Sequence, residues 1–522
     1  MKAQDYQISS EKFKFRSMDE NIHDKKLETK PIGYFKDALY RFTRNKGSIV
    51  AAFIIGFLVL FSIFGPLFTP YEVAEKDPYY ANVLPKNEFF ANLGIGFWDG
   101  CESVKGVSKL TRDKVLAIEQ ETGAKIIVGE IEEKEVTKKG KTTIEYTYKQ
   151  DTYAKVGIIM ISSMTPEEYE ALQKYQNETG IQVIFPITDT KLRTQAVSEK
   201  SNANIWYKTG NTQLTMNSPL IIEYDENGNL IPIYKAYSGG RDNYNSLRVE
   251  GDTPKYDYAI PKQNDTQWEV RVKYDEYYKF VHTVLKNDGI GYPSFLFGAD
   301  SNGRDIFVCL ASGARFSFIL AIVVAVVNLF VGAIYGAIEG YYGGKLDLFM
   351  ERISEILSSI PSMIVITLLK YHLKVDHWVV LFISFFLTGW VGMASRTRMQ
   401  FYRFKNQEYV LVARTLGARD RRIMFKHIFP NAIGTLITGS VLVIPSVIFS
   451  ETSLSYLGII NLESGNMTSV GTLLSNGQAA LYNFPHIILF PSLFISLLML
   501  SFNLFGNGLR DAFNPSLRGS EE

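Results

Sequence analysis

Long apolar runs alternate with polar stretches along this chain. Runs rich in Ile, Leu, Val, Phe, Gly and Ala lie at 47–68, 313–336, 353–371, 378–395, 431–455 and 486–506. Each approaches the roughly 20 residues that a helix needs to cross a bilayer core, so the pattern predicts six transmembrane helices. Pro361, Pro445 and Pro491 lie within or beside three of them and predict kinks, because proline cannot donate a helical hydrogen bond. Glycine and alanine at 332–340 predict close contact with a neighbouring helix.

A polar stretch rich in Tyr and Asn separates the first apolar run from the second, at 69–295. Two of its segments are alike: a helix-like sequence ends in Glu-Thr-Gly, at Gly123 or Gly180, and an apolar, strand-like run follows. Runs at 220–224 and 268–278 also predict strands. We therefore expect an α/β domain inserted between the first two membrane helices. Our interpretation is a weakly duplicated helix–strand module, and chance similarity is the alternative.

Composition excludes several classes of function. The 522 residues carry a formal charge of +1, so charge is informative only locally. Cys101 and Cys309 fall in different regions, which argues against a disulfide framework, and no metal-ligand spacing is present. Gly140-Lys141-Thr142 is like the end of a phosphate-binding loop, but Glu135 stands where that loop needs glycine. We expect no catalytic residue, no cofactor or metal bound by this chain, and no nucleic-acid partner.

The most basic stretch lies between two apolar runs, at 396–430. Its nine cations are Arg396, Arg398, Arg403, Lys405, Arg414, Arg419, Arg421, Arg422 and Lys426. Only Glu408 and Asp420 oppose them. Because Lys and Arg collect on the cytoplasmic side of membrane helices, this stretch is predicted to be a cytoplasmic loop. Gly417 interrupts the helical pattern after Leu416 and predicts two short helices that meet at an elbow.

The same charge rule orients the rest of the chain. The region before the first run is basic, whereas 457–485 holds no Lys or Arg. We predict a cytoplasmic tail at 1–46, the first membrane helix at 47–68, an extracellular α/β domain at 69–295, the remaining membrane core at 296–515 and a second cytoplasmic tail at 516–522. Phe35, Leu39 and Phe42 share one side of 32–46, which predicts an interfacial helix or, equally, an ordinary basic flank.

Residues 408–431 carry a family resemblance. The sequence Glu-Tyr-Val…Ala-Arg-Thr-Leu-Gly-Ala…His-Ile-Phe-Pro-Asn resembles the cytoplasmic coupling loop of ABC importer permeases, in its oligopeptide/dipeptide form. Gly417 and Pro430 have the family's separation, and Ala413 matches its second alanine. The chain departs from the general pattern at Leu411 and Val412, where the family often has Glu and Ala, and at His427.

Three further segments resemble the same branch. They are Phe297-Gly-Ala-Asp-Ser-Asn-Gly-Arg-Asp305 with Gly313-Ala-Arg315, then Glu451-Thr-Ser-Leu-Ser-Tyr-Leu-Gly458, then Asn503-Leu-Phe-Gly-Asn-Gly-Leu-Arg-Asp-Ala-Phe-Asn-Pro515. Charged groups at a membrane border need partners or water. We therefore assign a structural or gating role, rather than substrate contact or proton relay, to six residues: Asp300, Gly303, Arg304, Asp305, Arg315 and Glu451.

The resemblance implies a fold, a function and a set of partners. The fold is a helical membrane protein of six transmembrane helices with the inserted α/β domain. The chain would be the C-type permease subunit of an oligopeptide or dipeptide importer in a bacterial cell membrane. Its partners would be a related second permease, two cytoplasmic ATPases that hold ATP and Mg, an extracellular solute-binding lipoprotein and the lipid bilayer. The residues expected to couple it to the ATPase are Glu408, Tyr409, Ala413, Arg414, Leu416, Gly417 and Ala418.

Three alternatives stay open at this point. Permeases for nickel, glutathione and some sugars share this type, so the cargo is undetermined. A membrane-anchored receptor would need one or two spans and no elbow. A secondary transporter usually carries paired ionisable groups or broken helices at the midplane, and the sequence has no convincing pair.

Overall fold

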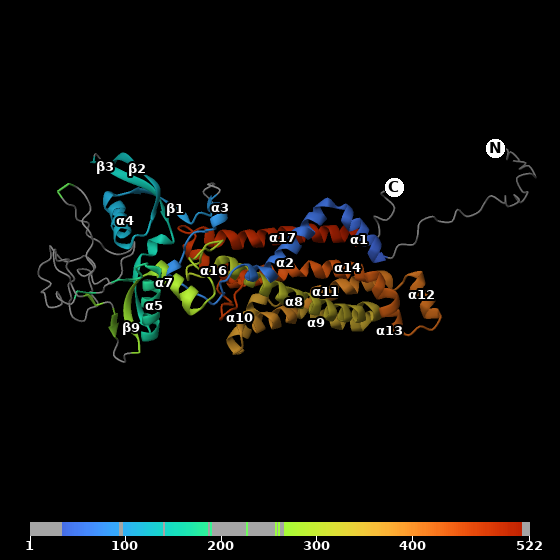
Figure 1. Ribbon diagram of the computed structural model, residues 1–522. Coiled ribbons are helices and arrows are strands. Elements are labelled where there is room, and N and C mark those ends of the chain that lie inside the picture. Colours follow the sequence, from blue (N-terminus) through green and yellow to red (C-terminus); the bar gives the residue numbers. More distant parts are fainter. Residues whose placement is uncertain are drawn as a thin grey trace, which may run out of the picture.

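The computed structural model describes residues 34–92, 98–138, 141–185, 188–189, 226–227, 256–257, 259–261 and 266–513. It has two parts: a bundle of long helices and, at one end of the bundle, a mixed α/β region (Figure 1). The expected strand at 220–224, the first 33 residues and the tail at 516–522 lie outside the described residues.

The bundle contains long apolar helices joined by short ones. They are α1 (Tyr34–Arg44), α2 (Lys46–Phe64), α8 (Ile306–Tyr342), α9 (Gly344–Ser359), α10 (Ser362–His372), α11 (His377–Phe404), α12 (Glu408–Thr415), α13 (Asp420–Arg422), α14 (Phe429–Val441), α15 (Val443–Tyr456), α16 (Val470–Gly477) and α17 (His486–Phe513). Within the described residues, five helical stretches are long and apolar enough to cross a membrane, and there are six if the bent pair α9–α10 is one span.

The six predicted spans are therefore all helical, but several of their bounds differ from those predicted. The third has the predicted kink at Pro361, where α9 and α10 meet at 74°, because proline cannot continue the hydrogen-bond ladder. The second begins at Ile306, capped by Asp305, and the fourth continues to Phe404. The expected basic loop is therefore shorter than predicted, since its first residues belong to α11. Helix α17 continues through Pro491.

Helices α8 and α11 pack closely along a stripe of small residues. A Cβ atom at Gly332 would lie 2.6 Å from the Trp390 carbonyl oxygen, and one at Gly340 would lie 2.7 Å from Cβ of Phe401. Real Cβ atoms do not approach so closely, so only glycine permits this spacing. The predicted close contact at 332–340 is confirmed.

In its described residues, the α/β region contains two larger antiparallel sheets and a separate two-stranded sheet, with helices beside them. Its strands are β1 (Cys101–Val107), β2 (Ile127–Lys138), β3 (Lys141–Asp151), β4 (Ile158–Met164), β5 (Ile184–Phe185), β6 (Thr188–Asp189), β7 (Tyr256–Asp257), β8 (Ala259–Pro261) and β9 (Trp268–Lys273). Its helices are α3 (Glu88–Asn92), α4 (Lys109–Thr122), α5 (Pro166–Thr179) and α7 (Tyr274–Phe280). One larger sheet has the order β1-β3-β2 and the other the order β4-β9-β5, with β8 also paired to β9, and the two-stranded sheet pairs β6 with β7.

The region is built from two copies of one module. We call β1–α4–β2–β3 the first module and β4–α5–β5–β9 the second module. Strand β4 starts 57 residues after β1, α5 starts 57 residues after α4, and both strands shift register at the same place, Val104/Val107 and Ile161/Met164. Ile127 pairs with Gln150 in the first module, as Ile184 pairs with Val272 in the second. The predicted duplication is confirmed and extends to four elements.

The run at 268–278 is only partly a strand. Strand β9 ends at Lys273, and α7 follows. Tyr274 and Tyr278, four residues apart, are both buried on one side of this helix. The prediction of strand over 274–278 was wrong: the segment is helical although it is rich in aromatic residues, which favour strands in general, and although Tyr274, Glu276, Tyr278 and Phe280 are buried at every second position.

Candidate functional site

The elbow is formed by α12, the turn at 416–419 and α13. Helix α12 ends at Thr415, and Gly417 has φ +79°, a left-handed conformation that favours glycine. The Gly417 N–H donates to the Arg414 carbonyl oxygen at 3.0 Å. The bend predicted at Gly417 is present. Only the first of the two predicted helices stands alone, because α13 continues through a π-helical stretch, Ile423–Ile428, into α14.

The inner side of the elbow is anchored to the ends of α8 and α11. Val410 is fully buried in an apolar cluster that also contains Ala337, Tyr341, Phe401, Ile423, Met424 and Ile428. The Tyr341 hydroxyl donates to the Asp420 carboxylate at 2.6 Å, and the Arg414 guanidinium lies 5.8 Å from the centre of the Tyr341 ring. Because apolar packing resists deformation, displacement of α12 must also displace these helix ends.

The outer side of the elbow is apolar and exposed. Leu416 is 82 % exposed, and Val412 is 56 % exposed. Tyr409 and Leu411 are also exposed, and Glu408 and Arg414 flank them. Ala413 is half-buried, and Ala418 packs against the inner cluster. Ala418 is thus directed away from the surface on which we expected it, while Leu411 and Val412 belong to that surface although the sequence analysis did not select them.

At the opposite end of the bundle, Arg304 ties three chain segments together. Its guanidinium is 1 % exposed and bonds to Asp300 at 2.8 Å and to Glu463 at 3.0 Å. Glu463 also accepts from Lys76 at 2.9 Å. A Cβ atom at Gly303, where φ is +75°, would overlap the Asp77 carbonyl. Four charged groups thus join the segment after α2, the start of α8 and the loop before α16.

Burial and hydrogen bonding set the pKa values of two carboxyls in this network. Asp305 caps α8 by accepting from the Phe307 N–H at 2.9 Å and also accepts from the Thr69 hydroxyl at 3.2 Å. Burial nevertheless raises the pKa of Asp305 to about 7. Burial also acts to raise the pKa of Glu463, but the hydrogen bond from Lys76 and the charge of Arg304 hold it below its usual range.

Two of the six predicted structural or gating residues lie apart from this network. Arg315 is exposed on α8 and has no ion pair with Asp300 or Asp305 in the part of the chain described. Glu451, on α15, is fully buried and accepts from Ser317 at 2.9 Å and from Ser455 at 3.1 Å. Hydroxyl donors therefore satisfy this carboxyl between α8 and α15. Glu463 was not among the predicted residues, although its place as an isolated acid in a loop without cations could have indicated it.

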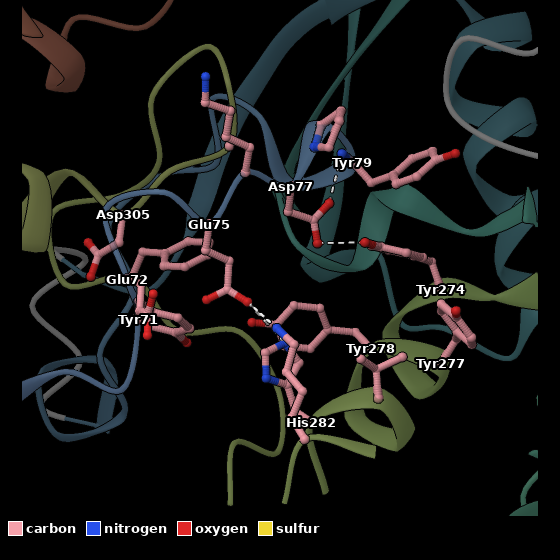
Figure 2. A pocket seen from close by; sticks show the side chains of 16 residues that line it. Tyr71, Glu72, Glu75, Asp77, Tyr79, Tyr274, Tyr277, Tyr278, His282 and Asp305 are labelled. Atoms are coloured by element: carbon pink, nitrogen blue, oxygen red, sulfur yellow. Dashed lines mark hydrogen bonds and ion pairs between the residues drawn. The ribbon is translucent and has the colours of Figure 1, made fainter. Parts of the chain in front are cut away.

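The α/β region meets the bundle around a tyrosine-lined cavity of about 240 Å³ (Figure 2). Tyr274, at the start of α7, donates to the Asp77 carboxylate at 2.5 Å. Tyr278 stacks on His282 with 4.1 Å between ring centres, and His282 lies 3.8 Å from Glu75. These side chains come from the segment after α2 and from α7 and the helical turn that follows it, directly after the second module, so this cavity marks the junction of the two parts.

The described residues contain no group of three or more His, Cys, Asp or Glu side chains arranged to hold a metal ion. Cys101 is half-buried and Cys309 is buried, and both are free thiols. The elbow and the Arg304 network contain no nucleophile paired with a base. These two sites offer an exposed apolar surface at one end of the bundle and a group of ion pairs between chain segments at the other.

Two family models match the chain. The model described as "Binding-protein-dependent transport system inner membrane component" matches residues 332–519, and "N-terminal TM domain of oligopeptide transport permease C" matches residues 33–86. These two ranges leave most of the α/β region unmatched.

Curated relatives also match part of the chain. The chain is 43 % identical over 222 residues to the oligopeptide transport system permease protein OppC of Bacillus subtilis, covering 42 % of this chain and 72 % of the relative. It is 38 % identical over 229 residues to the dipeptide transport system permease protein DppC of the same organism, covering 42 % of this chain and 69 % of the relative. A solved methionine ABC transporter, MetNI, aligns with 40 % of this chain and 96 % of its own at 14 % identity, with a TM-score of 0.33.

Proposed function

Because this chain belongs to the oligopeptide and dipeptide permease family of ABC importers, we propose that its elbow is the surface on which a cytoplasmic ATPase acts. The chain is a multi-pass transmembrane permease subunit of a peptide importer, and ATP hydrolysis takes place on separate ATPase subunits. One observation carries the proposal: the elbow is apolar and exposed at Leu416 yet anchored in the bundle at Val410.

In this proposal, Tyr409, Leu411, Val412 and Leu416 fill an apolar groove of the ATPase. Glu408 and Arg414 orient the contact, and Gly417 sets the bend. Closure of two ATPases on ATP would push α12, and the cluster around Val410 would carry the movement into α8 and α11. ATP changes the balance of inward and outward states only through its different affinity for the two.

The arrangement of the two parts supports an orientation. The elbow, α1 and the end of α17 lie at one end of the bundle, and the α/β region lies at the other (Figure 1). Phe35 of α1 also contacts Phe513, with 6.1 Å between ring centres. We propose that both chain termini and the elbow are cytoplasmic, that 69–295 is extracellular, and that this region contacts the solute-binding lipoprotein. A related permease would form the other half of the translocation pathway.

Gly417→Pro tests the role of the elbow. Proline cannot adopt φ +79° and has no N–H to donate to Arg414, yet no atom lies within 4 Å of the position a Cβ would take. The variant should insert and assemble normally, while peptide uptake falls at least tenfold relative to ATP hydrolysis. A matched control is Gly458→Pro, since Gly458 has φ +71°, open space and the same type of hydrogen bond, to Ser455.

The two variants separate strain from coupling. Gly458 lies in the loop after α15, at the end of the bundle away from the elbow, so its substitution should leave the ratio of uptake to hydrolysis near that of the unmodified importer. Normal uptake in Gly417→Pro would contradict the proposed role of the elbow. Labelling of a cysteine placed at Leu416 from outside intact cells would contradict the orientation.

A further inference from the structure

Arg398 joins three helices of the bundle, although it was counted as a loop residue in the sequence analysis. From α11 it donates to both carboxylate oxygens of Asp347, at 2.6 and 2.9 Å, and to both of Glu351, at 2.8 and 2.9 Å. Glu339, on α8, lies 3.5 Å from its Nε atom. We call Arg398 with these three acids the Arg398 cluster.

The geometry of the cluster favours a rigid joint. Two bidentate pairs fix the plane of the guanidinium, a geometry that a lysine ammonium cannot reproduce. The side chain of Asp347 is 7 % exposed, and that of Glu339 is 3 % exposed. Tyr402, one turn further along α11, donates a short hydrogen bond to Asp347. Because a buried ion is costly to leave unpaired, α9 cannot move relative to α11 without breaking several charged contacts.

The cluster lies between the elbow and the broken span. Helix α11 ends at Phe404, and α12 of the elbow begins four residues later, at Glu408. On the other side of the cluster, α9 leads to the 74° bend before α10. A cavity of about 570 Å³ lies between these helices; Glu339, Glu351 and Arg398 line one part of it, and Ser358, Pro361 and Ser362 line another. Broken helices inside a membrane protein are tolerated where they line such a cavity.

We propose that Arg398 is a positioning residue for transport: it transmits displacement of the elbow to the bend between α9 and α10, and so sets the shape of the cavity. The inference rests on the proposed function, because it assumes that an ATPase moves the elbow. It adds the route by which that movement reaches the broken span. When α11 moves, α8 with Glu339 moves with it because the two helices are closely packed. Helix α9 moves with α11 because the two bidentate pairs connect them.

Arg398→Lys tests the joint in the complete reconstituted importer. Lysine keeps the charge but pairs with one carboxylate at a time, so ATP hydrolysis should persist while peptide imported per ATP falls about tenfold, as expected for loss of charged hydrogen bonds. The matched control is Arg403→Lys, five residues further along α11, where the guanidinium is exposed and lies 5.5 Å from the Phe404 ring centre. That control should keep the normal ratio.

A second measurement separates positioning from simple stability. In a background with Cys101→Ser and Cys309→Ala, thiol labelling of Ser362→Cys should change with ATP, and so should labelling of Leu416→Cys. Arg398→Lys should abolish the response at Ser362 and leave the response at Leu416. Retention of the response at Ser362 with a normal transport ratio would overturn the proposal. If the cysteine at position 416 showed no response to ATP in the importer that keeps Arg398, the proposed function would instead be overturned.

A milder variant, Glu351→Gln, provides the test if Arg398→Lys does not assemble. Glu351→Gln keeps the shape of the side chain and leaves the Asp347 pair intact. It should give the same selective loss of the ATP response at Ser362, with a smaller fall in peptide imported per ATP. A full response at Ser362 in Glu351→Gln would also overturn the proposal.

Discussion

In the α/β region, the first module ends in an exposed hairpin, whereas the second module ends against the helical bundle. Strands β2 and β3 extend 12 and 11 residues, and both faces of the hairpin are largely exposed at 128–137 and 142–144. The corresponding strand of the second module, β9, has 6 residues and leads directly into α7. There Tyr274 and Tyr278 are buried at the junction cavity (Figure 2).

The comparison separates what local sequence determines from what neighbours determine. Both helices begin at a side-chain cap, Ser108 or Thr165, and end at a glycine with φ near +70°. One side chain in the last turn of each helix accepts hydrogen bonds from the N–H groups of two consecutive residues beyond the helix: Glu119 in the first module and Gln176 in the second. These local hydrogen bonds are equivalent in the two modules. The modules therefore differ in their position relative to the bundle because their last strands, β3 and β9, differ. The second module attaches the region to the bundle, and the first extends away from it.

The strongest test of this division is Tyr274→Ala. Tyr274 is 8 % exposed, donates to Asp77, and its ring lies 4.6 Å from that of Tyr79. Loss of a buried aromatic side chain costs about 3–5 kcal/mol. We expect much faster hydrogen exchange at 71–80 and at α7, because the junction opens, while the first module keeps its protection.

Tyr148→Ala is the matched variant in the first module. Tyr148 is 2 % exposed in the apolar cluster beneath α4. The loss of stability should be of similar size, but faster exchange should be confined to β1, β2, β3, α4 and the two residues of the second module in the same cluster, Ile158 and Phe185. Equal loss of protection at the junction in both variants would show that the modules form one cooperative unit and would contradict the division.

Sequence alone predicted the elements governed by local rules and missed the contacts between distant ones. Runs of apolar residues located all six spans, and glycine at the helix ends located the repeated module. Strand β9 was predicted within 268–278, but its pairing with β4 could not be, because the paired residues Ile158 and Lys273 are 115 positions apart. Arg398 looked like a loop cation, because the polar residues that follow Ser395 hide the continuation of α11 to Phe404. Its carboxylate partners lie on α8 and α9, and only the fold brings them together.

Gly123→Ala and Gly180→Ala test whether the two helix ends are equivalent. Their φ angles are +68° and +70°, and no atom lies within 4 Å of a Cβ at either position. The cost is therefore backbone strain alone, about 1–2 kcal/mol, and it should be equal in the two modules. Local opening free energies from hydrogen exchange of α4 and α5 would measure it. Gly291→Ala, at another open position without a positive φ, should cause little change. A difference of more than about 1 kcal/mol between the two module variants would contradict equivalent helix ends.

The smallest expected effect comes from exchanging the side chains of the two acceptors, Glu119→Gln in one variant and Gln176→Glu in another. Each substitution changes the strength of the hydrogen bonds in one module and keeps the shape of the side chain. Glu119 accepts from the N–H groups of Ile126 and Ile127 at 2.6 and 2.7 Å, and Gln176 accepts from Val183 and Ile184 at 2.9 Å each. Charged acceptors make stronger hydrogen bonds than neutral ones. Glu119→Gln should therefore destabilise the first module by about 1 kcal/mol, and Gln176→Glu should stabilise the second by a similar or smaller amount.

The gain in stability from Gln176→Glu should disappear below about pH 4, where a carboxyl is protonated. Hydrogen exchange at Ile127 and Ile184, measured at two pH values, would report both changes, and destabilisation of the second module by Gln176→Glu at neutral pH would show that the two contacts are not equivalent.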